Sequence, residues 1–445
     1  MACQLGRNAG KMPRINTATS RFPHPMTVRR TFVPLWLPAV FLAALCAAAP
    51  PLEAQTIAAT TNDVALMRQM LATVSSWDAK GKKAFDAPVL AELDAQWRRG
   101  YDPLLRIRAR ELVPAMEKAA LARPHLLAVA DAVKAARGTV RFEGGGPQWL
   151  REVAGDEAMH LFDRLTAIDL NDKGNPHDPT YKRNTTLSDG WLTNLVNLPD
   201  LTYLDLSNSN IAGPGLKHVG ALKSLERLNL TLTLVTDPWL EQIAGLTNLR
   251  VISLASAKCS GAGYKFLGNL KRLESANFHT APVDDAGLAG ISKVPSHERL
   301  EIVHTHFTNA GAQALAKLVN LERLQLGSRK ATGAAVKPLT GLKKLRELDL
   351  HDGQASVEGV RHASEIQSLR VLRVYGPIKD AGAQHIARLK NLEVLLVPGT
   401  QITDVGLESF AGLSRLKRLE ISGNKVSDAA VAKLRAAIPG LEIVR

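Results

Sequence analysis

Cysteine is scarce in this chain, and the usual metal and haem motifs do not occur. The 445 residues include three cysteines, Cys3, Cys46 and Cys259. Because the first two fall within an expected leader segment, the remaining chain has one cysteine and can form no internal disulfide. There is no paired CxxC, no CxxCH and no HExxH. The sequence therefore predicts no cofactor, no metal and no catalytic residues, and it predicts that Cys259 is a small buried hydrophobic residue.

Aromatic residues are also few, at 5% of the chain, although the formal net charge is +14. A basic protein of this kind is a candidate for binding nucleic acid or another polyanion. Many of its lysines and arginines, however, directly follow expected helices, where cations stabilise the negative helix end. With no aromatic side chains among these cations, there is no platform on which bases could stack. The sequence predicts no nucleic-acid partner.

Long apolar runs are limited to one, residues 32–49, which follows two arginines. A basic start, an apolar centre and small residues near the end are the three parts of a secretory signal peptide. We expect residues 1–54 to be a leader and signal peptide with Met26 as the true start. The protein is then exported, to the periplasm or the medium, with no membrane span after cleavage. A retained membrane anchor is the alternative.

Residues 55–137 form a different segment, rich in Ala, Leu, Lys, Arg and Glu, with apolar residues three and four positions apart. This spacing predicts several helices, with Pro88, Pro103 and Pro124 near helix starts. These helices would form a bundle of their own or cover the open end of the domain that follows. An enzyme module in this segment is an alternative, although its sequence shows no acid, base or metal constellation.

From residue 138 to residue 445 the chain is dominated by a 24-residue repeat. Each unit has three apolar positions spaced as in a short strand, one at offset ten, and three more spaced as on a helix face. One strand and one helix cannot bury their own apolar faces, so neighbouring units must pack on each other. Regular units begin at Leu201, Leu225, Leu249, Leu273, His297, Leu321, Leu345, Leu369, Leu392 and Leu416.

The unit pattern L-x-x-L-x-L, written as LTYLDLSNSNI and LEVLLVPGTQI, resembles that of leucine-rich repeats. Its second half, as in ITDVGL at 402–407, is similar to bacterial proteins with 24-residue TDxGL repeats and to the cysteine-containing leucine-rich repeat subclass. The resemblance implies an α/β fold, a right-handed solenoid shaped as a β/α horseshoe with an N-terminal helical segment. It also implies a non-catalytic binding protein.

Two polar features recur in the units. Thr or Ser followed by Asp, just before the helix, predicts an N-terminal helix cap. At the position where many leucine-rich repeats carry asparagine after the strand, this chain has Asn424 alone, with hydroxyl residues such as Ser209, Thr233 and Thr400 in other units. We expect hydroxyl groups to replace part of an asparagine ladder.

One unit carries an insert. Its strand begins at Leu165, but its second half resumes at Leu187, twelve residues late. The insert, near 173–186, is polar and must loop out of the array. Loops on a rigid scaffold often carry function, so the insert is a candidate recognition feature.

The main candidate site is the concave face of the predicted sheet, to which offsets two and four of each unit should point. We expect it to bind a protein or peptide partner. The candidate binding residues are Tyr203, Arg227, Asn229, Asn277, Arg299, Glu301, Arg323, Gln325, Glu347, Asp349, Arg373, Val394 and Leu396. The opposite charges at its centre would equally serve to stabilise neighbouring strands. Val371, Val394 and Leu396 make a more apolar end, which suits a protein partner.

A group of histidines and aspartates just past the strands contains the residue types that can bind zinc. They span four units, about 15 Å at a strand spacing of about 4.8 Å, so we expect a surface cluster instead of a zinc site. The residues are His279, His304, His306, His351, Asp349 and Asp352. A binder of envelope glycans or polyanions is the remaining functional alternative, and the oligomeric state is left open by the sequence.

Overall fold

The structure is a computed structural model, and it describes residues 103–148, 151, 156–171, 186–294 and 296–445. All of these belong to one compact unit, Ala58–Arg445. The expected signal peptide, the first part of the helical segment and the insert lie outside the described residues.

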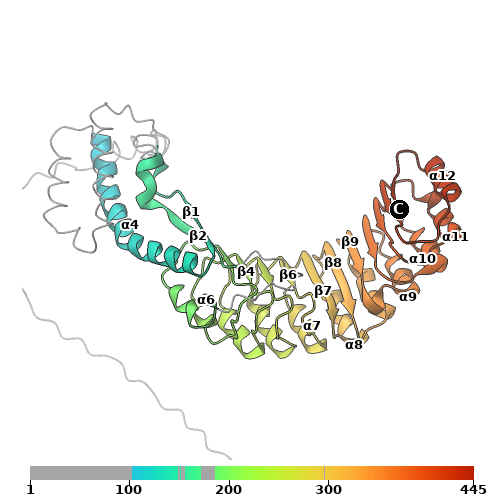
Figure 1. The fold of residues 1–445 in the computed structure, drawn as a ribbon, viewed down its shortest axis with the longest axis horizontal. Coiled ribbons are helices and arrows are strands. Elements are labelled where there is room, and N and C mark those ends of the chain that lie inside the picture. The colour runs from blue at the N-terminus through green and yellow to red at the C-terminus, as the bar shows by residue number, and fades with distance from the viewer. Residues whose placement is uncertain (1–102, 149–150, 152–155, 172–185, 295) are drawn as a thin grey trace, which may run out of the picture. The chain divides into compact units, whose positions relative to one another are not determined.

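The described strands form one open sheet of 13 strands that follow each other in sequence order (Figure 1). The first two strands pair antiparallel, and every later pair is parallel. Paired residues are 36 positions apart between β2 and β3, where the insert lies, 23 apart between β10 and β11, and mostly the predicted 24 apart in the other pairs. The strands are β1 (Thr139–Glu143), β2 (Arg164–Asp169), β3 (Tyr203–Asp205), β4 (Arg227–Asn229), β5 (Val251–Ser253), β6 (Ser275–Asn277), β7 (Arg299–Thr305), β8 (Arg323–Ser328), β9 (Glu347–Leu350), β10 (Val371–Val374), β11 (Val394–Leu396), β12 (Arg418–Glu420) and β13 (Glu442–Val444).

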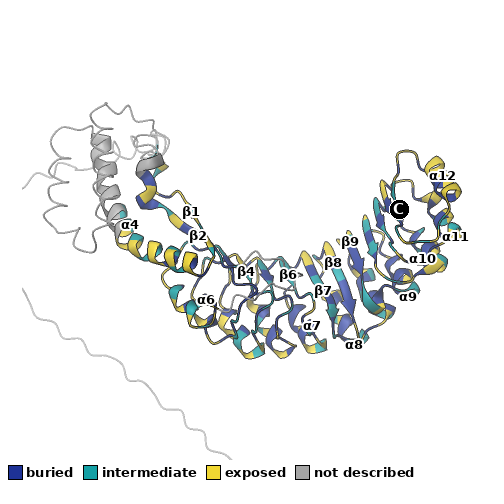
Figure 2. Cartoon of the chain, in the orientation of Figure 1, coloured by how far each residue is buried: buried dark blue, intermediate teal, exposed yellow. Residues whose placement is uncertain are grey.

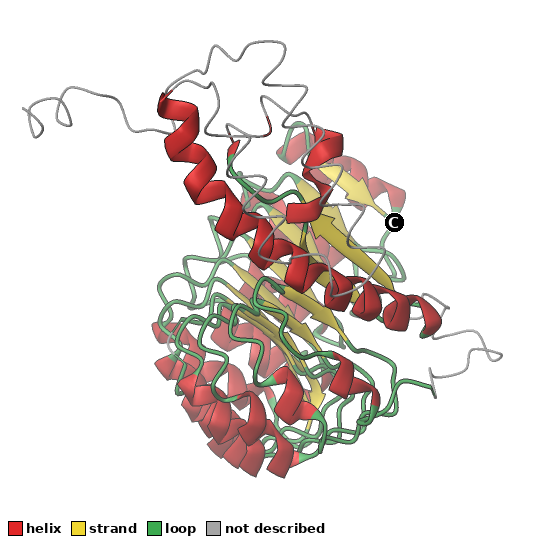
Figure 3. Cartoon of the chain, turned by 90° about the vertical axis from the view of Figure 1, so that its left-hand side faces the viewer, coloured by secondary structure: helices red, strands yellow, loops and turns green. Residues whose placement is uncertain are grey.

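Short helices return the chain from each strand to the next, and the end-on view separates the strand layer from the helix layer (Figure 3). The α-helices are α4 (Pro103–Ala135), α6 (Leu216–Val219), α7 (Asp285–Ile291), α8 (Asn309–Ala312), α9 (Val357–Ala363), α10 (Lys379–Ile386), α11 (Asp404–Glu408) and α12 (Asp428–Ala437). The 3-10 helices are η2 (Asp156–Phe162), η3 (Trp191–Asn194), η4 (Asp237–Ile243), η5 (Ala262–Asn269), η6 (Gln313–Lys317), η7 (Gly333–Gly341), η8 (Asp352–Gln354) and η9 (Ser409–Gly412).

The core is one continuous cluster of buried, mostly aliphatic side chains. Residues coloured as buried recur along the whole series of repeats in Figure 2. The second residue of each strand from β3 to β12 faces this core, as Leu204, Leu228 and Ile252 do, and these three residues are directly paired in the sheet. Each unit thus contributes one layer to a shared core, and burying a Leu or Ile side chain stabilises the fold by about 1.5–3 kcal/mol. The predicted leucine-rich repeat solenoid is confirmed.

Side-chain hydroxyl groups donate hydrogen bonds to some of the buried backbone carbonyl oxygens, as predicted. The Oγ of Ser209 donates to Leu206 O at 2.7 Å, and Thr400 Oγ1 donates to Val397 O at 2.9 Å. The side-chain amide of Asn424 adds the hydrogen bond expected of an asparagine ladder, because its Nδ2 donates to Val397 O at 2.6 Å. A backbone carbonyl left unpaired in the core would cost about 1–3 kcal/mol, so these side chains hold the turns in place.

The Thr/Ser-Asp pairs cap helices in a way that the sequence pattern did not predict. Thr403 makes no side-chain cap to its own helix. Instead Asp380 of the preceding unit accepts from Thr403 N at 2.8 Å, Thr403 Oγ1 at 2.7 Å and Gly406 N at 3.0 Å. Asp285 binds Thr308 in the same manner. The capping prediction is confirmed for Ser427, which accepts from Ala430 N, but the aspartates join one unit to the next.

Helix α4 packs its C-terminal part against the first units. Val129, Val133 and the following Ala136 are buried in the same core as the repeats. Pro103 begins this helix as predicted, but the expectation of a helix start at Pro124 is wrong, because α4 continues through it. A proline inside a helix removes one backbone hydrogen bond, and the burial of the two valines beyond it offsets that loss.

Candidate functional site

Two rows of side chains cross the concave face, defined here as the sheet surface opposite the helices. The first row runs through Tyr203, Arg227, Val251, Ser275, Arg299, Arg323, Glu347, Val371, Val394 and Arg418. The second runs through Asp205, Asn229, Ser253, Asn277, Glu301, Gln325, Asp349, Arg373, Leu396 and Glu420. All the candidate binding residues lie on these rows.

The charged centre of the concave face is largely paired with itself. Arg323 Nη2 lies 2.6 Å from Glu347 Oε1, and Arg373 Nη1 lies 3.6 Å from Glu347 Oε2 and 2.8 Å from Asp349 Oδ1. Asp349 is 5% exposed, and burial raises its pKa while the bond from Arg373 opposes that rise. Burial likewise raises the pKa of Glu301. A ligand that used these charges would first have to break bonds that already satisfy them.

At the N-terminal end of the concave face a second network surrounds Asp205, which is also buried. Asp205 Oδ1 accepts from Ser207 N and Oγ, and its Oδ2 accepts from Asn229 Nδ2 at 2.9 Å and from the Tyr203 hydroxyl at 3.3 Å. The guanidinium of Arg227 lies 5.9 Å from the centre of the Tyr203 ring. Burial and the nearby Asp205 raise the pKa of Tyr203 to about 12, so its hydroxyl keeps its proton and acts as a donor.

The opposite end of the concave face is apolar. Val371 and Val394 are directly paired and Leu396 lies beside Arg373, and all three aliphatic side chains are half-exposed. Tyr375 follows β10 and is 43% exposed, and its ring stacks on His351 with centres 4.6 Å apart. This stretch combines aliphatic side chains with an exposed aromatic ring.

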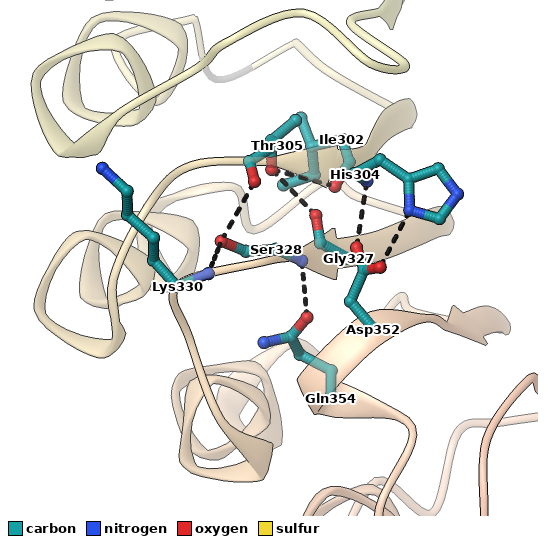
Figure 4. A network of polar contacts seen from close by, with 8 residues as sticks. All are labelled: Ile302, His304, Thr305, Gly327, Ser328, Lys330, Asp352 and Gln354. Carbon is teal, nitrogen blue, oxygen red and sulfur yellow. Dashed lines mark hydrogen bonds and ion pairs between the residues drawn. The ribbon is translucent and has the colours of Figure 1, made fainter.

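Histidines line the edge of the sheet where the strands end. The His279 and His304 rings meet edge to face at 5.3 Å, and His304 and His351 at 6.1 Å. His304 Nδ1 lies 2.8 Å from Asp352 Oδ1, and its backbone N–H donates to Oδ2 (Figure 4). Within the described residues no group of three or more His, Cys, Asp or Glu side chains is placed to hold a metal ion. The cluster is a row of ring contacts fixed by one carboxylate.

The single cysteine of the described residues is buried in the core. Cys259 Sγ donates to Val235 O at 3.3 Å, and burial raises the pKa of the thiol to about 12. A thiol needs a lowered pKa to act as a nucleophile. The prediction that Cys259 is a buried hydrophobic residue is confirmed.

The described part of the chain also holds no helix that combines the length and apolar character needed to cross a membrane.

The sheet and the core define the fold, which is that of a leucine-rich repeat solenoid. A family sequence model described as "Leucine Rich repeat" matches residues 197–219. No curated protein matches the chain in sequence.

Similar solved structures include two bacterial proteins and one plant protein. An internalin (inlF) from Listeria monocytogenes is 18% identical with a TM-score of 0.37, covering 56% of this chain and 81% of the internalin. An internalin C2 from the same organism is 17% identical with a TM-score of 0.35, covering 60% and 92%. A plant peptide hormone receptor, RGFR1 in complex with RGF2, is 17% identical with a TM-score of 0.35, covering 56% and 45%. Similarity at this level does not transfer a function.

Sequence reasoning missed two features of the site. Tyr375 occupies the same offset in its unit as His279 and His351, so the shared offset was the signal that could have placed it in the row. The bond between His304 and Asp352 had no such signal, because it skips a whole unit.

Proposed function

We propose that this chain is a non-catalytic, exported scaffold that binds a protein or peptide on its concave face. The observation that carries the proposal is the half-exposed aliphatic group of Val371, Val394 and Leu396 beside the exposed ring of Tyr375. Aromatic and aliphatic anchors surrounded by polar groups are the usual centre of a protein interface. Arg373 and Glu420 flank the group in the same row of the sheet and provide polar contacts at its border.

The scaffold supports this role because its core is continuous and its concave side chains project from strands. Groups held on strands of a packed array lose little freedom when a partner binds, which favours affinity.

We further infer that the units are of the bacterial TDxGL type, similar to the cysteine-containing subclass. The aspartates of two Thr-Asp pairs bond the next unit's serine, Asp237 with Ser260 and Asp404 with Ser427, which gives the TD pair a structural role in these units.

The test is capture of a partner from envelope and culture-medium fractions with the chain lacking residues 1–54. A variant with both Val394→Glu and Leu396→Glu places charges in the aliphatic group. The matched control is Val405→Glu, because Val405 is 60% exposed on α11, in the same unit but in the helix layer.

The proposal expects the wild type and the Val405→Glu variant to retain the same partner and the double variant to lose it. A double variant that folds normally and retains the partner would refute the concave site. Export is tested separately with the full-length chain, and recovery of that chain in the cytoplasmic fraction alone would refute export.

A further inference from the structure

The N-terminal end of the concave face contains a cavity of about 540 Å³ between the β1–β2 pair and strands β3 and β4. Its origin is a small residue in the first row. Ala167 pairs with Arg141 on one side and with Tyr203 on the other. The methyl side chain of Ala167 leaves the floor of the cavity open between these two large neighbours. The volume is within the range of about 300–1,000 Å³ typical of small-ligand sites.

Charged groups lining this cavity make no ion pair with a residue that the structure describes, unlike those at the centre of the concave face. The side chains of Arg141 and Glu143 form no hydrogen bond or ion pair with any other residue that the structure describes. The Arg227 guanidinium lies against the Tyr203 ring and makes no hydrogen bond or ion pair with another described residue. Asp169 accepts one bond, from Asn171 N at 2.9 Å to its Oδ1. A ligand can bond to these groups without breaking an existing ion pair, which is not true of Arg323, Glu347 and Arg373.

The charges in the cavity balance. Two guanidinium groups, from Arg141 and Arg227, face two carboxylates, from Glu143 and Asp169. A strongly anionic or cationic ligand would meet as many repulsive as attractive groups, and an apolar ligand would desolvate all four without pairing them. A neutral ligand that carries both donors and acceptors satisfies both kinds of group.

We propose that this cavity binds a neutral oligosaccharide. Vicinal hydroxyls present adjacent donors and acceptors, which match the two-pronged geometry of a guanidinium and of a carboxylate. The Tyr203 ring supplies an apolar surface for the C–H face of a sugar, and the Asp205 network holds that ring in place. This site is distinct from the proposed protein surface at the C-terminal end, and either can fail without the other.

The test is calorimetric titration of the chain lacking residues 1–54 with maltohexaose, cellohexaose and chitohexaose. A heparin-derived hexasaccharide and the peptide triglycine represent anionic and zwitterionic ligands. Ala167→Phe fills the floor of the cavity on its solvent side. Ser275→Phe is the matched control, because Ser275 lies in the same row of the sheet on β6 and does not line the cavity.

We expect at least one of the neutral hexasaccharides to bind at one site, and Ala167→Phe and Arg141→Ala each to weaken that binding by about tenfold or more. Ser275→Phe should leave it unchanged. Failure of all three neutral sugars to bind would overturn the proposal. Binding that is restricted to the heparin fragment or triglycine would overturn it too, as would equal binding by the Ala167→Phe variant.

Discussion

The Nδ1 atom of His304 lies 2.8 Å from Oδ1 of Asp352, although the two residues are 48 positions apart and one complete unit lies between them. Asp352 also accepts from the backbone N–H of His304. The carboxylate reaches across the intervening unit at Gly327, where an added Cβ would lie 2.8 Å from Asp352 Oδ2 (Figure 4). Bonds such as that of Asp380 with Thr403 join adjacent units, whereas this contact joins two units that have another unit between them.

Removing this carboxylate is expected to weaken the centre of the array. Asp352→Ala should lower the free energy of unfolding by about 1 kcal/mol, since the bond is charge-assisted but the His304 ring is partly exposed to solvent. Chemical denaturation measures the change. Asp428→Ala, at a 92% exposed carboxylate near the end of the array, is the control and should cost less.

Gly327→Ala is expected to destabilise the protein through the same contact, because the new methyl group occupies the path of the Asp352 carboxylate. The cost should be smaller when Asp352→Ala is already present. A double-mutant cycle measures this coupling. Strictly additive effects would show that Gly327 and Asp352 act independently.

Asp285 provides a test of the bonds between units. Its carboxylate accepts from Thr308 N at 2.6 Å and from Thr308 Oγ1 at 2.7 Å. In the next unit Asn309 makes the equivalent contacts to Thr332. Asp285→Ala should therefore cost about 1–3 kcal/mol, and Asp285→Asn clearly less. Equal losses in the two variants, measured by denaturation, would contradict the role assigned to these bonds.

Stability should fall in mild acid because of a buried histidine. His297 takes the place of a core leucine, is 1% exposed and has an unbonded Nδ1, and burial lowers its pKa to about 4. Its unfolded pKa is about 6.5, so the unfolded state binds the proton more tightly and stability is lost as pH falls through 6.5 toward 4. The loss from this residue is about 2 kcal/mol at pH 5.

His297→Leu should raise stability at pH 7 and reduce its loss between pH 7.5 and pH 5. Thermal unfolding at both pH values checks this. His160→Leu is the control, since the His160 side chain is 68% exposed. If the His297→Leu variant loses as much stability between pH 7.5 and pH 5 as the wild type does, the pH dependence arises from other groups.

Arg373→Ala leaves the buried carboxylate of Asp349 without its closest cation. The expected cost is about 1–3 kcal/mol at pH 7. Because the pKa of Asp349 is already raised in the folded state, removing Arg373 should raise it further, so the gap from the wild type narrows as pH falls and Asp349 becomes protonated. Denaturation at pH 7 and pH 4.5 measures the gap, and a gap that widens in acid would contradict this assignment.

The spacing of apolar residues was sufficient to predict the solenoid, because strand register and core position both follow from the 24-residue period. It placed Val394 and Leu396 on the concave face and Ser209 and Thr400 in the turns correctly. It could not predict which charges pair, since side-chain geometry alone places the Arg373 guanidinium within reach of both Glu347 and Asp349. Nor could it predict the cavity, which depends on the antiparallel pairing of Arg141 with Ala167 in irregular first units.

The most direct test of the proposed role is to find which face touches the partner in the living cell. A photoreactive benzoylphenylalanine is placed at Leu396 on the concave face and, separately, at Val405 on α11. Irradiation should give a covalent adduct with another protein or peptide from position 396 and none from position 405. Adducts from position 405 alone, or equal adducts from both, would contradict the account.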